Sequence, residues 1–214
     1  MESLKENFRI LRIRVESQTA LPAIVVVSAA MSGDGTTYVA SGLARAFAEA
    51  GHRTLLLEAN TARPGVAESL DIRPIPPTCT AVGLHARQAD VPGLWVTALR
   101  GGPADGTIRE LTSRLRSEFA VTVIDAAAIP TSSTALQFSH AADALLVAVR
   151  TGRRACVADQ ELLRLIGDGD VRLLGIVPTK ARGRRLSPPL STPQLVPEVV
   201  DSPAHFAPRA GARG

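Results

Sequence analysis

A loop with two glycines joins an apolar run to an amphipathic segment near the start of the chain. It reads SAAMSGDGTT over residues 28–37, and its glycines allow the backbone to turn sharply. Where such a loop follows a strand and opens a helix, its N–H groups converge and the helix dipole favours an anion. We therefore expect a phosphate cradle formed by Gly33, Asp34, Gly35, Thr36 and Thr37.

The loop departs from the usual phosphate-binding motif, G-x-x-x-x-G-K-[ST], at two positions. The first glycine position holds Ala30 or Ser28, depending on the register, and the lysine position holds Thr36. Thr37 keeps the hydroxyl that binds magnesium in this motif, but the charge that neutralises the β- and γ-phosphates is missing. As a bare pattern, the loop also fits a tight strand-to-helix turn capped by Thr36.

Short apolar runs alternate with amphipathic segments on both sides of this loop. Strands are expected at residues 23–29, 54–59, 94–99, 121–126, 144–150 and 172–179. Helices are expected at 2–16, 36–51, 108–119, 134–142 and 153–169, with a short helix near 81–88. Apolar strands that alternate with helices are typical of a parallel sheet covered on both faces. The sequence thus predicts a doubly wound α/β fold with a mainly parallel sheet.

The chain divides into three predicted parts. Residues 1–20 hold an amphipathic helix with an apolar stripe of Leu4, Phe8, Leu11 and Val15, and residues 21–182 carry the α/β pattern. Residues 183–214 are rich in Pro and Arg and show no periodic stripe, so we expect a disordered tail.

Composition narrows the class of protein. With 45% hydrophobic and 21% charged residues, the chain is neither collagen-like nor a coiled coil nor wholly disordered. Cys79 and Cys156 lie far apart without metal or redox spacing, and no signal segment or membrane-spanning run is recognisable, so a cytoplasmic location is expected. The 24 basic residues against 20 acidic ones suit an acidic partner, or they reflect only a coding preference for arginine.

Further motifs accompany the loop. Glu6, Arg9 and Arg12 form an E-x-x-R-x-x-R pattern, and LLLEANTARP, VTVIDAA, ADALLVAVR and LLGIVPTK follow at residues 55–64, 121–127, 142–150 and 173–180. In this order and at these spacings, the motifs resemble bacterial tyrosine kinases of capsular and exopolysaccharide biosynthesis. Those kinases are relatives of the deviant-Walker ATPases that include the MinD and ParA families. The resemblance covers about residues 2–181 and implies a P-loop NTPase fold of the deviant-Walker type.

The resemblance also implies a set of functional residues for ATP and magnesium. Thr37, Glu58 and Asp125 are the expected metal ligands, and Asp125, Glu58 and Arg63 the expected catalytic residues. Thr179 takes the place of the asparagine that reads the adenine edge. Arg153 and Arg154, at a predicted helix start, are interpreted as a solvated pair, with contact to a nucleotide or a partner as the alternative.

The same resemblance implies assembly. Glu6, Arg9 and Arg12 match an oligomerisation element, although they also fit a solvated helix face. Implied partners are further copies of the chain, an active kinase homologue, or the cytoplasmic end of a membrane chain-length-determinant protein. A peripheral position at the inner face of the plasma membrane follows, and no specific nucleic-acid partner is expected.

Departures from the kinase pattern favour a protein without efficient catalysis. Thr36 replaces the lysine, the neutral Asn60 replaces a second carboxylate, and Thr134 takes the place of an expected Asp. Tyr38 is the one tyrosine of the chain, so the C-terminal tail has no tyrosine to phosphorylate. Tyr38 itself lies in the helix that follows the loop and is expected to be buried. We hypothesise a degenerate, non-catalytic or weakly active regulator of polysaccharide synthesis. Alternatives are an active kinase or ATPase with a divergent loop, and a ParA- or MinD-like positioning ATPase.

Overall fold

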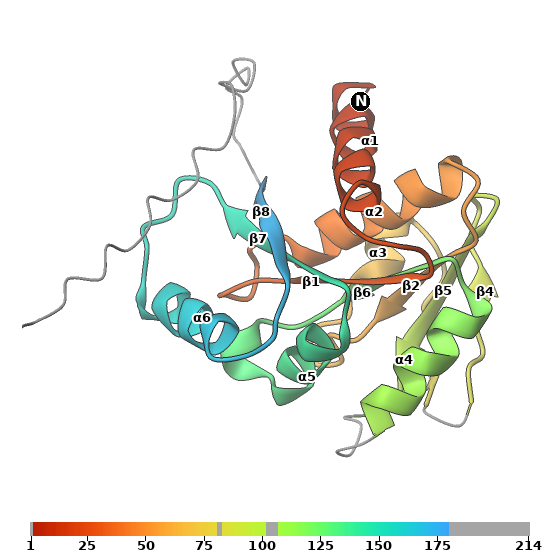
Figure 1. Ribbon diagram of the computed structural model, residues 1–214. Coiled ribbons are helices and arrows are strands. Elements are labelled where there is room, and N and C mark those ends of the chain that lie inside the picture. The colour runs from red at the N-terminus through yellow and green to blue at the C-terminus, as the bar shows by residue number, and fades with distance from the viewer. Residues whose placement is uncertain (1, 81–82, 102–106, 180–214) are drawn as a thin grey trace, which may run out of the picture. The chain divides into compact units, whose positions relative to one another are not determined.

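The apolar runs predicted as strands pair into one sheet in the computed structural model, which describes residues 2–80, 83–101 and 107–179 (Figure 1). The strand order is β3-β5-β2-β6-β1-β7-β8, and β4 adds antiparallel to β5. All other pairs are parallel. The strands are β1 Ala23–Ser28, β2 Thr54–Glu58, β3 Pro77–Cys79, β4 Arg87–Gln88, β5 Leu94–Leu99, β6 Val121–Asp125, β7 Ala144–Arg150 and β8 Leu173–Thr179.

Helices cover both faces of the sheet, as Figure 1 shows. Buried side chains of α1, α2 and α3 pack on one face, and those of α4, α5 and α6 pack on the other. Their bounds are α1 Glu2–Glu16, α2 Thr36–Glu49, α3 Val66–Leu70, α4 Thr107–Glu118, α5 Ser133–Ala141 and α6 Val157–Gly167, and a 3₁₀ turn spans Ile129–Thr131. The doubly wound, mainly parallel fold predicted from the sequence is confirmed.

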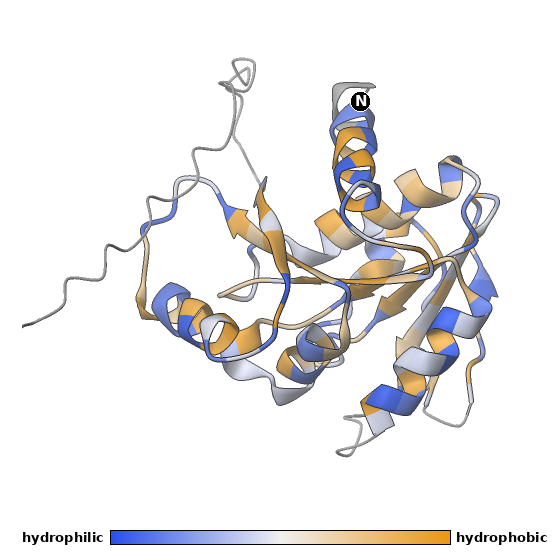
Figure 2. Ribbon diagram, viewed as in Figure 1, coloured by the Kyte–Doolittle hydropathy of each residue, from blue (hydrophilic) through white to orange (hydrophobic). Residues whose placement is uncertain are grey.

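Hydropathy follows this layering. In Figure 2 the central strands are mostly apolar, whereas the helices carry both apolar and polar residues. Every residue of β1, β2 and β6 is buried, as the uninterrupted apolar runs predict for strands covered on both faces. Within the described part of the chain, no helix combines the length and apolar character that a bilayer crossing requires.

Two predicted elements differ from the structure. The short helix near residues 81–88 is wrong where the structure describes it, because Arg87–Gln88 form strand β4 against β5. The helix predicted at 153–169 begins only at Val157, because Asp159 accepts the Cys156 N–H at 2.8 Å and caps the helix there. The predicted tail at 183–214 lies outside the described residues, so the three-part division stays a prediction.

Helix α1 lies against α2, and a glycine makes this contact possible. The Phe8 ring sits over Gly42 so closely that a Cβ there would come within 2.3 Å of the ring. Val15 is fully buried at the other end of the same stripe. The predicted apolar stripe is thus confirmed for its described side chains, and α1 is part of the folded unit.

Candidate functional site

The glycine loop has the form of an anion cradle. It follows β1, takes positive φ values at Gly33 (88°) and Gly35 (96°), and leads directly into α2 at Thr36. No side chain caps this helix start and its first turn holds no acidic residue. Backbone N–H groups at a helix start without a side-chain cap, together with the helix dipole, attract a phosphate. The predicted strand, loop and helix are therefore in place.

Asp125 lies beside this loop because β6 pairs with β1, with Val27 as the register partner of Asp125. The Thr37 hydroxyl donates to Asp125 Oδ2 at 2.7 Å. The carboxyl group is fully buried, and its second oxygen, Oδ1, has no hydrogen-bond partner in the described structure. A buried carboxylate oxygen that lacks a donor is suited to a cation. The structure thus brings two of the predicted metal ligands, Thr37 and Asp125, into contact.

Burial shapes the acidity of Asp125. Removal from water raises its pKa from 3.8 to about 7, and the Glu58 charge adds to the rise, whereas the Thr37 and Thr36 hydroxyls oppose it. The charged form is therefore disfavoured until a cation or another donor compensates for the lost hydration.

Glu58 faces Asp125 from the neighbouring strand, where the two are register partners. Its Oε1 accepts the N–H groups of Gly65 at 2.6 Å and Val66 at 2.8 Å. These bonds cap the start of α3, so this oxygen holds the 59–65 loop in place. The predicted metal and catalytic roles of Glu58 remain predictions, and the structure adds a structural role to them.

Arg63 extends from the same loop toward the glycine loop. Its Nη1 donates to the Ser32 hydroxyl at 3.1 Å on the exposed rim. Asn60, at the place of the missing second carboxylate, is half-buried. The loop after β2 thus places Arg63 at the edge of the glycine loop, and its predicted catalytic role stays a prediction.

Asp34, in the centre of the loop, is ion-paired with Arg153, which the sequence analysis assigned to solvent. Its side chain is 1% exposed and accepts from Arg153 Nε at 3.1 Å. Arg153 is itself only 10% exposed and donates through Nη1 to Asp159 at 2.6 Å. The hydrogen bond with Arg153 holds the pKa of Asp159 well below its usual range. The interpretation of Arg153 as half of a solvated pair was wrong, because two carboxylates enclose it.

Thr179, at the end of β8, supports the loop from the other side. It is buried, and its hydroxyl donates to the Asp34 carbonyl oxygen. A Cβ at Gly35 would lie 3.0 Å from this hydroxyl, so the loop and Thr179 are closely packed. Its predicted part in adenine binding stays a prediction. Thr134, at the place of another expected Asp, lies in the first turn of α5.

The predicted oligomerisation residues are divided by the structure into two groups. Glu6 and Arg9 are exposed and pair with each other at 3.3 Å. Arg12 is 19% exposed and binds Glu16 at 2.6 Å, and Glu16 also contacts His52 at 2.9 Å beyond the end of α2. Arg12 therefore helps to hold α1 against the domain, whereas Glu6 and Arg9 face outward.

Tyr38 lies in the first turn of α2, as expected, but it is not buried. Its side chain is 45% exposed, and its ring meets the Phe8 ring edge-on with centroids 5.3 Å apart. The expectation failed because α1 covers only one side of this turn.

One curated relative is similar to this chain in sequence. The succinoglycan biosynthesis transport protein ExoP of Rhizobium meliloti (strain 1021) is 25% identical over 195 residues, which cover 82% of this chain and 25% of that protein. The chain thus spans about a quarter of the length of this relative. No protein-family model matches the chain.

Solved structures share the fold. The chimerical protein CapA2B2 superimposes with a TM-score of 0.69 at 19% identity, covering 81% of this chain and 83% of that one. The kinase domain of Escherichia coli tyrosine kinase ETK gives 0.68 at 16% identity, covering 89% and 80%. The septum site-determining protein MinD of Pyrococcus horikoshii, complexed with Mg-ADP, gives 0.56 at 16% identity, covering 72% and 68%. The chain therefore has the fold of bacterial tyrosine-kinase domains and of MinD, and the resemblance seen in its sequence motifs is confirmed.

Proposed function

We propose that this chain is a kinase-like P-loop protein of capsular or exopolysaccharide synthesis that binds magnesium nucleotide but transfers phosphate poorly or not at all. One observation carries the proposal. Thr36 occupies the lysine position of a loop in which the half-buried Thr37 still donates to the buried Asp125, whose Oδ1 accepts no hydrogen bond in the described structure. A site that keeps its predicted magnesium ligands but lacks the lysine is suited to nucleotide binding rather than to phosphate transfer.

The oxygen atoms of Asp125 and Thr37 suit a magnesium ion. Asp125 Oδ1 is buried without a hydrogen-bond partner among the described residues, and the Thr37 hydroxyl lies on the same carboxylate. These two groups would hold the ion, with Glu58 beside them in register. Bound magnesium supplies positive charge to the β- and γ-phosphates, and the N–H groups of the loop orient them.

The missing lysine limits catalysis. Loss of one donor that stabilises transition-state charge typically costs about 2.7–4 kcal/mol, or roughly 10²–10³ in rate. Arg153 does not replace it, because its charge is already shared by Asp34 and Asp159. Arg63 reaches the loop only at its exposed rim. We infer that turnover is lost or very slow.

Docking is the function that remains, and α1 supplies a surface for it. Glu6 and Arg9 are exposed beside Ile10 and Ile13, whose side chains are 46% and 54% exposed. An apolar pair next to charged groups suits a protein partner. We propose that this face docks on further copies of the chain, on an active kinase homologue, or on the cytoplasmic end of a membrane chain-length-determinant protein. The chain would then lie peripherally at the inner membrane face.

A thermal-shift titration with Mg-ADP tests the nucleotide site. Ligand at a hundred times its dissociation constant adds about 2.7 kcal/mol to stability, which raises the melting temperature measurably. We expect a shift in the natural chain, a larger one in Thr36→Lys, and none in Asp125→Asn or with EDTA present. Equal shifts in the natural chain and Asp125→Asn would rule out the proposed magnesium site.

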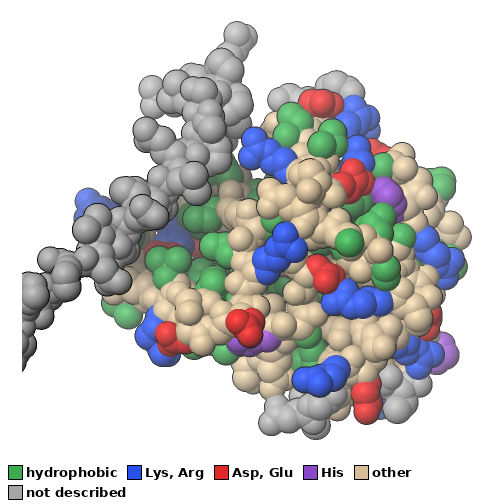
Figure 3. All heavy atoms as spheres, in the orientation of Figure 1, with side chains coloured by type: hydrophobic (Ala, Val, Ile, Leu, Met, Phe, Trp, Pro, Cys, Tyr) green, Lys and Arg blue, Asp and Glu red, His purple; other side chains and the backbone are tan. Residues whose placement is uncertain are grey.

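An active kinase or ATPase with a divergent loop is the second candidate, favoured by the contact between Thr37 and Asp125. Incubation with γ-labelled ATP and magnesium separates the two. Phosphate release or transfer that depends on Asp125 would replace the docking proposal with this enzyme. A third candidate, a ParA- or MinD-like positioning ATPase, finds less support. Lys/Arg and Asp/Glu side chains are interspersed over the face seen in Figure 3, without a broad basic stripe for nucleic acid.

A further inference from the structure

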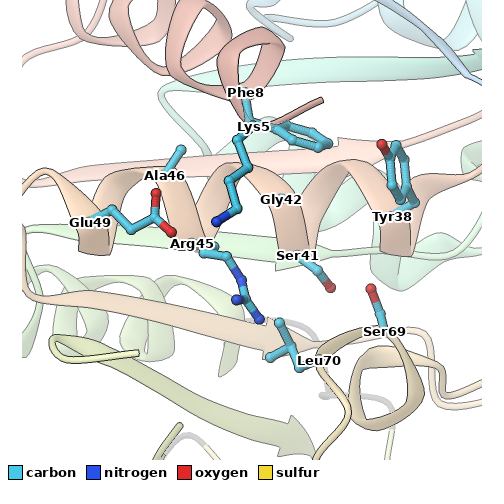
Figure 4. A pocket seen from close by; sticks show the side chains of 10 residues that line it. All are labelled: Lys5, Phe8, Tyr38, Ser41, Gly42, Arg45, Ala46, Glu49, Ser69 and Leu70. Carbon is cyan, nitrogen blue, oxygen red and sulfur yellow. The ribbon is translucent and has the colours of Figure 1, made fainter. Parts of the chain in front are cut away.

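A pocket separate from the glycine loop lies on the outer side of α2, between this helix and its neighbours α1 and α3 (Figure 4). Its volume is about 250 Å³. Pockets for drug-sized ligands measure about 300–1,000 Å³, so this one suits a group the size of a large side chain. The nucleotide motifs do not include it, and its lining residues come from all three helices.

Two cations line the pocket without ion-pair partners among the described side chains. They are Lys5 on α1 and Arg45 on α2. Glu49 is the one acidic residue of the lining, so the lining carries a net positive charge. In Figure 4 the Lys5 amino group lies between Glu49 and Arg45, and the Arg45 guanidinium points toward Leu70. Cations without ion-pair partners at a surface pocket favour an anionic ligand.

Hydroxyl groups add to these donors. Ser41 is 3% exposed, and its Oγ is buried with no hydrogen-bond partner in the described structure. In Figure 4 the Ser41 and Ser69 oxygens face the same space. A buried hydroxyl without a partner is costly unless a ligand or water completes it. Ser41 is thus an unfilled hydrogen-bonding position in the pocket wall.

The rest of the wall is apolar and partly aromatic. Phe8 and Tyr38 meet edge-on at 62°, and Leu70 closes the opposite side. A flat apolar group gains from contact with such rings by burial and by edge or offset stacking. The pocket therefore combines anion-binding donors with a surface for a flat ring.

We propose that this pocket binds an aryl phosphate monoester, the chemistry of a phosphotyrosine side chain. The phosphate has three strong acceptor oxygens, which match the donors of Lys5, Arg45 and Ser41 better than the two oxygens of a carboxylate do. The ring lies against Phe8 and Tyr38. This site is separate from the glycine loop, so it stands whether or not the loop binds nucleotide.

Isothermal titration of the full chain with phenyl phosphate, inorganic phosphate and phenol tests the ligand class. We expect phenyl phosphate to bind at least fivefold more tightly than either fragment, and saturating Mg-ADP to leave its affinity unchanged. A phosphotyrosine peptide that binds more tightly than phenyl phosphate would identify a protein as the source, and a weaker one would identify a free small molecule. Absence of phenyl phosphate binding, or its displacement by Mg-ADP, would overturn the proposal.

Variants of the lining locate the site. Arg45→Gln and Lys5→Gln should each weaken phenyl phosphate about tenfold, because each removes a charge-assisted hydrogen bond. Ser41→Ala should weaken it less, and Glu49→Gln should strengthen it about threefold by removing a repulsive charge. Arg164→Gln, an exposed arginine that pairs with Glu161 and Asp168, is the matched control and should have no effect. Unchanged affinity in both Arg45→Gln and Lys5→Gln, with native melting temperatures, would refute the assignment.

Discussion

The Asp34 carboxylate in the glycine loop is ion-paired with the Arg153 guanidinium, 119 positions later in the chain. The Asp34 side chain is only 1% exposed, so its negative charge is removed from water and depends on Arg153 for compensation. Asp159 completes the arrangement and also caps α6. The conformation of the glycine loop thus depends on the segment that links β7 to α6.

Arg153→Ala tests this dependence. Removal of one partner of a buried pair leaves an uncompensated charge, which typically costs about 3–5 kcal/mol. We expect a loss of this size in the free energy of unfolding, measured by urea denaturation. The double variant Asp34→Ala with Arg153→Ala should recover much of it, and Arg164→Ala, whose pairs are exposed, should leave stability unchanged. A loss below about 1 kcal/mol, the range of surface pairs, would contradict the burial of this pair.

The raised pKa of Asp125 predicts how stability depends on pH. The carboxyl ionises near 3.8 when unfolded but only at about 7 in the folded chain, chiefly because burial disfavours its charge. The folded state therefore holds a proton that the unfolded state has lost, and stability contributed by this group falls as pH rises from about 4 to 7.

Asp125→Asn removes this ionisation while keeping the size of the side chain. Without magnesium, we expect the variant to be more stable than the natural chain at pH 8 and to differ much less from it at pH 5. Urea denaturation at the two pH values measures both differences. A gain that is the same at pH 5 and pH 8 would show that the Asp125 carboxyl titrates outside this window.

Gly42→Ala tests the packing of α1 on α2. Alanine normally favours a helix over glycine by about 1 kcal/mol, but a Cβ here would come within 2.3 Å of the Phe8 ring. We expect a net loss of stability and displacement of α1, seen as faster amide exchange along this helix. Gly167→Ala is the control, because its added Cβ meets no atom within 4 Å beyond its own stretch of helix. Equal or higher stability in Gly42→Ala would show that α1 moves at little cost.

The two cysteines should differ in reactivity. Burial raises the pKa of the Cys79 thiol to about 11, so almost no thiolate forms at pH 8, whereas Cys156 is partly exposed. Iodoacetamide at pH 8, followed by mass spectrometry, should label Cys156 in the folded chain and both residues in denaturant. Cys79→Ala should leave the rate of native labelling unchanged. Rapid labelling of Cys79 in the folded chain would show that β3 opens to solvent.

Much of the fold follows from local sequence pattern. Uninterrupted apolar runs such as Ala23–Ser28 mark strands buried on both faces, and helices with one apolar face mark the covering layers. The short strands Pro77–Cys79 and Arg87–Gln88 were missed, because they are too short to carry a period and form only by pairing with β5.

The candidate site was predicted only in part. Gly33 and Gly35 identify the loop by residue type, and Asp125 stands out as a carboxylate at the end of an apolar strand. That Thr37 touches Asp125 follows from the pairing of β1 with β6. The contact from Glu58 to the start of α3 is local, since it joins residues seven and eight positions apart, but no residue type in the loop points to it.

The sequence by itself determined that a doubly wound sheet carries a glycine loop without a lysine, since strand periods and residue types are local properties. Only the tertiary structure decided that Arg153 encloses Asp34, that Tyr38 is exposed and that Lys5 and Arg45 share a pocket. These relationships join residues on separate elements, whose distances depend on sheet order and helix packing rather than on spacing along the chain.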